Sequence, residues 1–120
     1  MNFDDNKAIY VQIKEYVCEQ ILSGKYQVGE RAMSVRELGS KLEVNPNTVL
    51  RAYEELVANN IIYNKRGVGY FVAEDAVETV RREQKKQFME KDLPAVFRTM
   101  KLLNISVEEI ESLYQLFLNQ

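Results

Sequence analysis

The sequence predicts a mainly helical fold with one small β-hairpin: a winged helix-turn-helix followed by a helical C-terminal segment. Three observations support this fold class. Two short amphipathic helices, each with its own N-terminal cap, are expected in tandem between residues 34 and 59. Two β-rich runs then flank a basic loop with glycines at residues 61–72. Beyond residue 75 glycine is absent, and apolar residues recur at helical spacing through a charged segment.

Residues 7–23 are expected to form the first helix, which supports the two that follow. Its apolar residues fall mostly on one side, and Gly24 suits a left-handed C-terminal cap. Cys18 lies on this helix and is interpreted as a packing residue, with a thiol sensor as the less favoured alternative. Residues 25–33 are expected to be a loop that can hold a short edge strand.

The tandem helices are predicted from their caps. Ser34 with Glu37 makes a capping box before the first of them, residues 35–42. Asn45 caps the second helix, which runs from Pro46 to about residue 59, and proline is well placed at a first helical position. A buried stripe on the second helix leaves a polar face near its N-terminus. The stripe consists of Val49, Ala52, Tyr53 and Leu56, and the polar face of Asn47, Thr48 and Arg51.

This polar face predicts contact with DNA, because the N-terminal end of the second helix of such a pair enters the major groove. Short Asn and Thr side chains donate and accept at base edges or phosphates. Asn45 is expected mainly to cap, and Tyr53 mainly to pack, with its hydroxyl free to reach a phosphate. Arg36 lies in a first helical turn, where a phosphate would offset the unfavourable helix dipole; a surface salt bridge is the alternative.

The hairpin is predicted to be a wing. Its tip, residues 64–69, carries Lys65 and Arg66, which suit a minor groove or adjacent phosphates, although an ordinary solvated hairpin is the alternative. Gly67 and Gly69 permit close approach to another backbone. For Arg31 a phosphate contact and a solvated charge are equally favoured. The expected DNA-contacting residues are Arg31, Ser34, Arg36, Asn45, Asn47, Thr48, Arg51, Lys65, Arg66, Gly67 and Gly69.

We expect two domains, a winged helix-turn-helix at residues 1–75 and a helical dimerisation segment at residues 76–120. The second is too rich in large apolar residues for about 45 residues to bury alone, which favours packing on a second copy. A homodimer would match the two-fold half-sites that such proteins read. The residues expected at the dimer interface are Val77, Phe88, Phe97, Met100, Leu103, Ile110, Leu113, Tyr114 and Phe117.

Composition excludes several function classes. The 120 residues contain no histidine and one cysteine, so the sequence offers no metal-ligand set and no nucleophile–base pair, and neither an enzyme nor a cofactor is expected. No apolar run suits a membrane span, the acidic N-terminus is not a signal peptide, and cytoplasmic localisation is expected. The net charge of −2 is unlike that of a general nucleic-acid binder.

The first 74 residues resemble the DNA-binding part of the GntR family of bacterial transcription regulators. Asn45-Pro46-Asn47-Thr48-Val49 and the short C-terminal segment resemble its small YtrA-like subfamily. A dimeric regulator of transcription is expected, with repression favoured over activation. The family usually has Leu-Pro where Ala32-Met33 stands, and many members have arginine at Pro46, so one base contact should be missing here. The other shared motifs are Ile9-Tyr10-x-Gln12-Ile13, Ile21 to Gly24, Gly29-x-Arg31, Ser34-Val35-Arg36-Glu37-Leu38, Tyr53-x-x-Leu56 and Gly67-Val68-Gly69-Tyr70-Phe71-Val72.

Two other functions stay open at this point. The overall negative charge also suits a winged protein-interaction module that does not bind DNA. RNA binding through the wing is disfavoured because the sequence does not indicate paired aromatic stacking residues on an exposed sheet. The operator, the regulated genes, the sign of regulation and any small-molecule effector cannot be obtained from the sequence.

Overall fold

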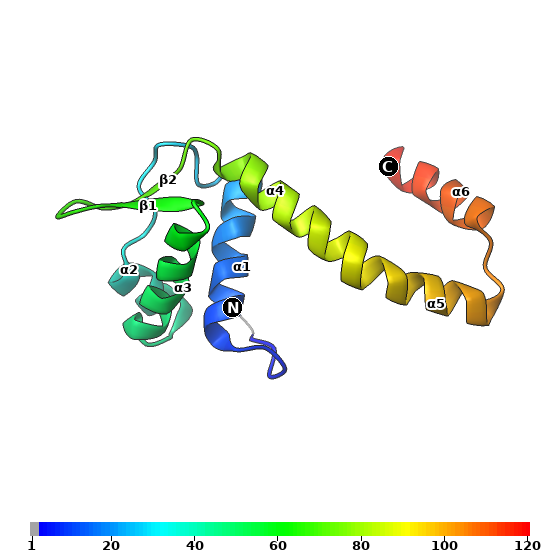
Figure 1. The fold of residues 1–120 in the computed structure, drawn as a ribbon, viewed down its shortest axis with the longest axis horizontal. Helices are drawn as coiled ribbons and strands as arrows, with labels where there is room; N and C mark the ends of the chain where they lie inside the picture. Colours follow the sequence, from blue (N-terminus) through cyan, green and yellow to red (C-terminus); the bar gives the residue numbers. More distant parts are fainter. Residues whose placement is uncertain (1–2) are drawn as a thin grey trace. The chain divides into compact units, whose positions relative to one another are not determined.

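The computed structural model describes residues 3–120, and contacts divide the chain into a first unit that ends at Arg82 and a second unit, Glu83–Gln120. The predicted fold class, mainly helical with one hairpin, is confirmed (Figure 1). Along the chain the elements are α1 (Ile9–Leu22), α2 (Val35–Leu42), α3 (Pro46–Ala58), β1 (Ile62–Lys65), β2 (Gly69–Val72), α4 (Ala76–Gln87), a π-helical turn η1 (Phe88–Asp92), α5 (Leu93–Leu103) and α6 (Val107–Leu118).

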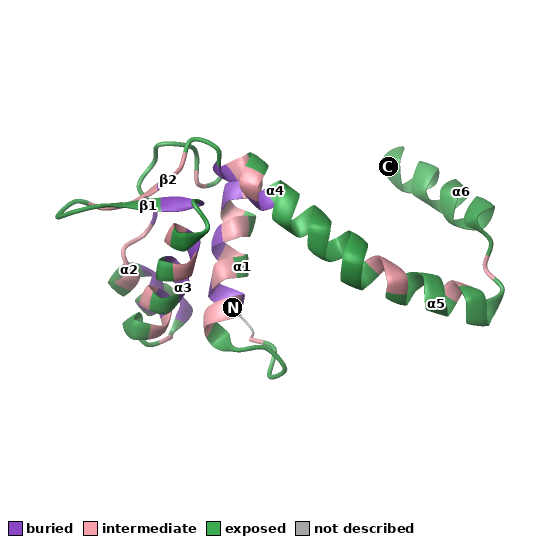
Figure 2. Cartoon of the chain, viewed as in Figure 1, coloured by how far each residue is buried: buried purple, intermediate pink, exposed green. Residues whose placement is uncertain are grey.

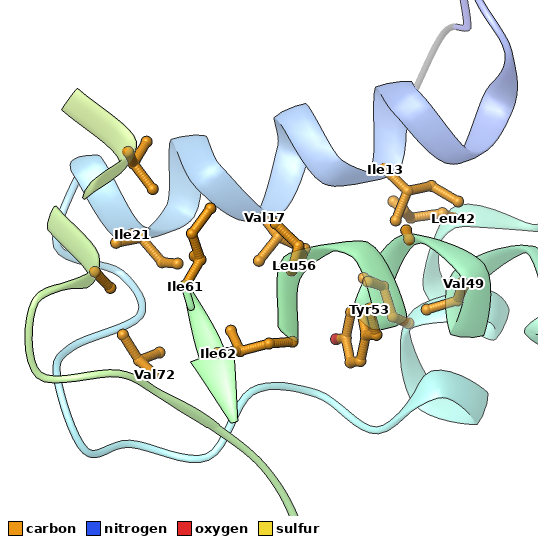
Figure 3. Close-up of a cluster of buried hydrophobic side chains, with 14 residues drawn as sticks. Ile13, Val17, Ile21, Leu42, Val49, Tyr53, Leu56, Ile61, Ile62 and Val72 are labelled. Carbon is orange, nitrogen blue, oxygen red and sulfur yellow. The ribbon is translucent and has the colours of Figure 1, made fainter. Parts of the chain in front are cut away.

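One hydrophobic core holds the first unit together. Ile13, Val17 and Ile21 recur at four-residue spacing on α1 and are fully buried against α3 and the hairpin (Figure 3). Ala76 and Val80, at the start of α4, are buried in the same cluster. The first turns of α4 therefore belong to the core of this unit.

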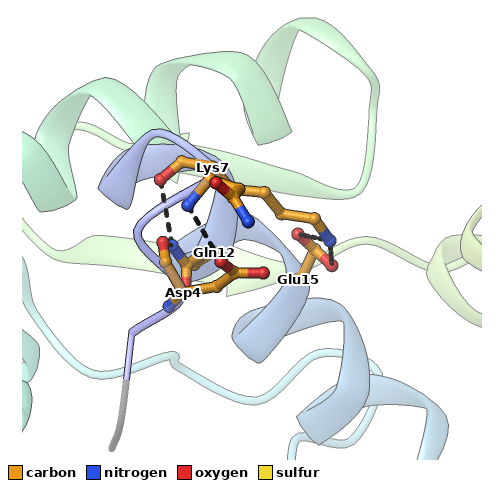
Figure 4. Close-up of polar contacts among 5 residues, drawn as sticks. Asp4, Lys7, Gln12 and Glu15 are labelled. Carbon is orange, nitrogen blue, oxygen red and sulfur yellow. Dashed lines mark hydrogen bonds and ion pairs between the residues drawn. The ribbon is translucent and has the colours of Figure 1, made fainter.

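Gln12 organises the residues before α1, and its side chain is almost fully buried. Its Oε1 accepts a 2.7 Å hydrogen bond from the Asp4 N–H, and its Nε2 donates to the main-chain carbonyls of Asp4 and Lys7 (Figure 4). A buried amide is stabilising when its donors and acceptor find partners. Gln12 therefore ties the N-terminal turn to α1, and Lys7 adds an exposed ion pair with Glu15.

A third segment of the chain, just before α2, pairs with the hairpin formed by β1 and β2. β1 and β2 are antiparallel, with Ile62 opposite Val72. The expected edge strand before α2 exists as a single bridge between Arg31 and Phe71, and the Ala32 N–H donates to the Tyr70 carbonyl at 2.9 Å. This pairing connects the base of the wing to the residues that lead into α2.

The second unit is helical, and its helices α5 and α6 contain no buried residue (Figure 2). Pro94 lies in the first turn of α5 and lacks an N–H, so it cannot complete an α-helical hydrogen bond to residue 90. The π-helical turn lies just before it, and the Leu93 N–H donates to the Phe88 carbonyl. No helix within residues 3–120 has the length and apolar character that a membrane span requires.

Candidate nucleic-acid interface

The turn between α2 and α3 is tight because one side chain is missing. Gly39 on α2 faces the turn, and a Cβ placed on it would lie 2.9 Å from the Val44 carbonyl oxygen and 3.4 Å from the Pro46 Cα. The Val44 N–H donates to the Gly39 carbonyl at 2.9 Å, and Glu43 takes a left-handed conformation with φ of 58°. Gly39 therefore allows the two helices to approach closely, a role that sequence reasoning missed.

Both predicted caps are present. The Ser34 hydroxyl accepts a 3.1 Å bond from the Glu37 N–H, and the Glu37 carboxylate accepts from the Ser34 N–H. These bonds to Ser34 lower the pKa of Glu37. The Asn45 Oδ1 accepts a 2.8 Å bond from the Asn47 N–H. Because their oxygens already serve as caps, Ser34 and Asn45 keep chiefly a hydroxyl proton and an amide NH₂ for any DNA contact.

The outward face of α3 carries the predicted reading residues. Asn47 and Arg51 are exposed on the side opposite the buried stripe, whereas Thr48 is half-buried. Glu54 follows Arg51 by three residues and is exposed on the same face of α3, a position that sequence reasoning overlooked. A carboxylate there can accept a hydrogen bond from a cytosine amino group but repels phosphates.

Two arginines flank the start of α2. Arg31 is about half exposed; its Nη2 lies 3.8 Å from the Glu37 carboxylate, and its stem lies beside Gly69. Arg36 is exposed and forms no ion pair within residues 3–120. The surface salt bridge that was the alternative to a DNA contact for Arg36 is therefore not present among these residues. Both guanidinium groups retain donors for phosphate oxygens.

The wing tip is a tight turn with two cations. The Val68 N–H donates to the Lys65 carbonyl at 2.9 Å, and Gly67 has a φ of 79°. Gly69 has a φ of 143°, which an L residue rarely adopts. Lys65 and Arg66 are exposed, and the tip extends beyond the helices of the first unit (Figure 1). The predicted wing residues are thus gathered on one projecting loop.

An aromatic pair lies on the outer face of the hairpin, contrary to the sequence-based expectation. Tyr63 and Phe71 are cross-strand partners, and their rings stack with centroids 5.7 Å apart. Lys65 places its ammonium 5.1 Å from the Phe71 ring centroid. The expectation was wrong because the pairing depends on the hairpin register, which puts residues 63 and 71 on one face.

Tyr53 is not available to DNA, which corrects the expectation that its hydroxyl could reach a phosphate. The side chain is fully buried, and its hydroxyl donates a 2.6 Å hydrogen bond to the Met33 carbonyl. Burial raises the pKa of Tyr53, so the hydroxyl keeps its proton and remains a donor. Its ring meets Tyr70 edge to face at 4.9 Å, which joins α3 to the wing.

Cys18 has the environment of a packing residue. Burial raises the pKa of its thiol to about 11, with Lys14 acting in the opposite direction. Within residues 3–120 no group of three His, Cys, Asp or Glu side chains is arranged to hold a metal ion.

The side chains expected at a dimer interface fall into two environments. Val77 is half-buried and packs against the core of the first unit, and Met100 is half-buried in the second. The others are exposed: Phe88, Phe97, Leu103, Ile110, Leu113, Tyr114 and Phe117. Sequence reasoning missed Leu102, which is 82% exposed. An open apolar hollow of about 330 Å³ lies between α5 and α6, lined by Ala95, Val96, Thr99, Met100, Ile105 and Ile110.

Comparisons with known proteins agree with this geometry. The chain is 32% identical over 108 residues to the HTH-type transcriptional regulator YhcF of Bacillus subtilis, covering 90% of this chain and 88% of YhcF. It is 42% identical over 72 residues to the transcriptional repressor YtrA of the same organism, covering 60% of this chain and 55% of YtrA. A solved GntR-family regulator of Bacteroides thetaiotaomicron superposes with a TM-score of 0.79 at 42% identity, covering 93% and 97% of the two chains.

The matched region includes both helices of the helix-turn-helix and the wing. Residues 9–72 match the family model described as bacterial regulatory proteins, gntR family. These residues extend from the start of α1 to the end of β2. The chain therefore belongs to the GntR family of bacterial regulatory proteins, with the small regulator YtrA among its relatives.

Proposed function

We propose that this regulator represses transcription as a homodimer on double-stranded DNA, each copy placing α3 in a major groove and its wing at the neighbouring minor groove or phosphates. The observation that carries the proposal is the exposure of Asn47 and Arg51 on a doubly capped helix-turn-helix, with exposed Lys65 and Arg66 on the wing of the same unit. Family membership favours DNA binding over the protein-interaction alternative. The proposed activity places the protein in the cytoplasm.

Local charge supports specific rather than general binding. The net charge of the chain is −2, yet six cations are exposed around the helix-turn-helix and wing. Phosphate contacts orient a protein on the duplex, whereas base contacts on α3 provide sequence preference. The proposed phosphate and groove contacts are made by Arg31, Arg36, Lys65 and Arg66, with Gly67 and Gly69 at the wing and Ser34 and Asn45 at the helix starts. Base reading is assigned to Asn47, Thr48 and Arg51.

Nuclease protection tests the DNA-binding proposal. The purified full chain should protect a discrete site in the DNA upstream of its own coding region, with affinity that falls as salt rises. Arg51→Ala should weaken that site by about 1–3 kcal/mol, while Lys65→Ala should weaken all sequences about equally. Lys25→Ala removes a charge from an exposed loop residue outside the proposed interface and should leave binding unchanged.

Absence of any salt-sensitive, site-selective protection would contradict the proposal, as would equal losses from Arg51→Ala and Lys25→Ala. Stoichiometric capture of a protein partner without any DNA affinity would instead favour the interaction-module alternative.

The apolar surface of the second unit supports the homodimer. Phe117 is 66% exposed and Leu113 is 61% exposed on α6, and such groups are usually buried. Contiguous exposed apolar surface of this kind marks a protein interface. A second copy also supplies the second helix-turn-helix that a two-fold operator requires.

Sedimentation measures the assembly directly. The wild-type mass should be twice that of the 14.0 kDa chain at micromolar concentration. Leu113→Asp should shift the mass toward that of one chain, whereas Ser112→Asp, an exposed polar neighbour, should not. A monomeric wild type, or equal masses for the two variants, would contradict the pairing.

A further inference from the structure

The first turn of α1 meets the reading helix through an aromatic ring. The Arg51 Cζ lies 3.7 Å from the centroid of the Tyr10 ring, the closest cation–ring contact within residues 3–120. Tyr10 is half-buried against the core, whereas the Arg51 side chain is 64% exposed. A half-buried ring thus lies against a guanidinium group that still faces solvent.

Glu55 lies beside the same arginine on a second side. The Arg51 Nε lies 4.0 Å from one Glu55 carboxylate oxygen, and the other oxygen accepts a 2.9 Å bond from Lys14 on α1. Lys14 is the more buried partner of that pair, which restrains the carboxylate. The guanidinium group is therefore located by a ring below it and a carboxylate at its Nε edge.

This arrangement leaves the outer edge of Arg51 free. Stacking uses the face of the guanidinium plane, and the Glu55 contact is made at Nε. Within residues 3–120 the two terminal nitrogens make no hydrogen bond. Terminal N–H groups of arginine form the paired donors that recognise phosphate oxygens or the acceptor edge of guanine.

We propose that Tyr10 is a positioning residue for DNA binding, which holds Arg51 extended with its terminal donors directed toward the duplex. The inference rests on the proposed contact between Arg51 and DNA. A free arginine loses rotamer entropy when it binds, whereas one already stacked has lost much of it beforehand. Helix α1 therefore takes part in DNA binding without contacting the duplex through Tyr10 itself.

A double-mutant cycle on the full chain tests this role. The probe is a fluorescent duplex carrying the site that the wild type protects. Arg51→Ala should weaken binding ~10-fold or more, as loss of a direct contact does. Tyr10→Ala should weaken binding ~3–10-fold when Arg51 is present and have no further effect when Arg51 is already Ala. Tyr10→Phe keeps the ring and should bind within ~2-fold of the wild type.

Stability is measured in parallel by urea unfolding, because Tyr10 also packs against the core. Tyr10→Leu keeps apolar bulk without a ring, and it should retain the folded state and still lose DNA affinity. Arg51→Lys keeps the charge but lacks the planar group, so the affinity of this variant should depend less on Tyr10 than that of the wild type.

The outcomes separate the positioning role of Tyr10 from the proposed contact between Arg51 and DNA. If Tyr10→Ala and Tyr10→Leu weaken binding equally with and without Arg51, Tyr10 is only structural and the inference fails. It also fails if both variants bind like the wild type. If Arg51→Ala itself binds like the wild type, the DNA contact of Arg51 and this inference fail together. The ligand atoms are distinguished by sequence preference: a base contact of Arg51 affects the specific site alone, and a phosphate contact affects all duplexes.

Discussion

The hydroxyl of Tyr53 on α3 donates a 2.6 Å hydrogen bond to the main-chain carbonyl of Met33, the residue just before the cap of α2. The bond joins positions twenty residues apart in the sequence. Because Tyr53 also meets Tyr70 of β2 edge to face, one buried side chain connects the reading helix, the entry to α2 and the wing.

Tyr53→Phe should therefore lower the free energy of unfolding by about 1–2 kcal/mol, since the Met33 carbonyl loses its side-chain donor while the ring remains. Urea denaturation measures the loss. DNA affinity of the folded variant should be unchanged, because the hydroxyl is directed into the protein. An unaltered stability combined with weakened DNA binding would show that the hydroxyl acts on the duplex instead.

Gly39→Ala should destabilise the first unit. The added methyl group would lie 2.9 Å from the backbone oxygen of Val44, a contact that only movement of the turn can relieve. The cost of overpacking, about 1–3 kcal/mol, should exceed the gain in helix propensity of about 1 kcal/mol. Ser40→Ala, at an exposed position of the same helix, should change stability by less than about 0.5 kcal/mol. Equal stabilities of the two variants, measured by thermal unfolding, would contradict this account of the turn.

How far sequence reasoning succeeds depends on whether a feature is local. Capping boxes involve residues three apart, so Ser34 with Glu37 and Ser106 with Glu109 are both readable from the chain, and the structure contains both boxes. The bounds of α2, and the start of α3 at Pro46, follow from such signals.

Contacts between distant residues could not be obtained in this way. The stack of Tyr63 on Phe71 depends on hairpin register, and the stack of Arg51 on Tyr10 depends on how α1 packs against α3. Periodicity identifies which face of a helix is polar but not which neighbouring side chain supports it. The clash that limits Gly39 likewise arises only after the chain has turned.

Gly69→Ala should weaken DNA binding through Arg31. A Cβ at residue 69 would lie 2.7 Å from the Arg31 Nε, so the guanidinium group must move. Gly29→Ala is the matched control, because Gly29 also has a positive φ but nothing lies within 4 Å of the added atom. Both variants should lose about 1–3 kcal/mol of stability through backbone strain.

Only Gly69→Ala should also lose affinity in fluorescence anisotropy titrations, measured at a temperature where both variants are folded. Equal affinities of the two variants would mean that the position of Arg31 against Gly69 has no part in binding.

Cys18 should be unreactive near neutral pH. Its pKa of about 11 leaves roughly one thiol in a thousand ionised at pH 8. Alkylation of the folded protein should therefore accelerate about tenfold per pH unit up to about pH 11, whereas the urea-unfolded chain should level off near the ordinary pKa of 9.0. Mass spectrometry of iodoacetamide-treated samples follows both reactions.

The raised pKa of Cys18 also makes the free energy of unfolding depend on pH. Because folding raises the pKa of Cys18, its contribution is complete below about pH 9 and is lost as pH rises toward 11. Cys18→Ala should remove that part of the alkaline decline. Rapid alkylation of the folded protein at pH 7 would instead support the interpretation of Cys18 as a thiol sensor.

The unburied side chains of α5 and α6 have a quantitative consequence for gene control. In the proposed homodimer, two chains must combine before both halves of a two-fold operator are filled. Occupancy then rises with roughly the square of protein concentration in the dilute regime, by mass action. A regulator of this design responds to its own synthesis rate more steeply than a single-chain repressor does, and modest dilution during cell growth would release its target disproportionately.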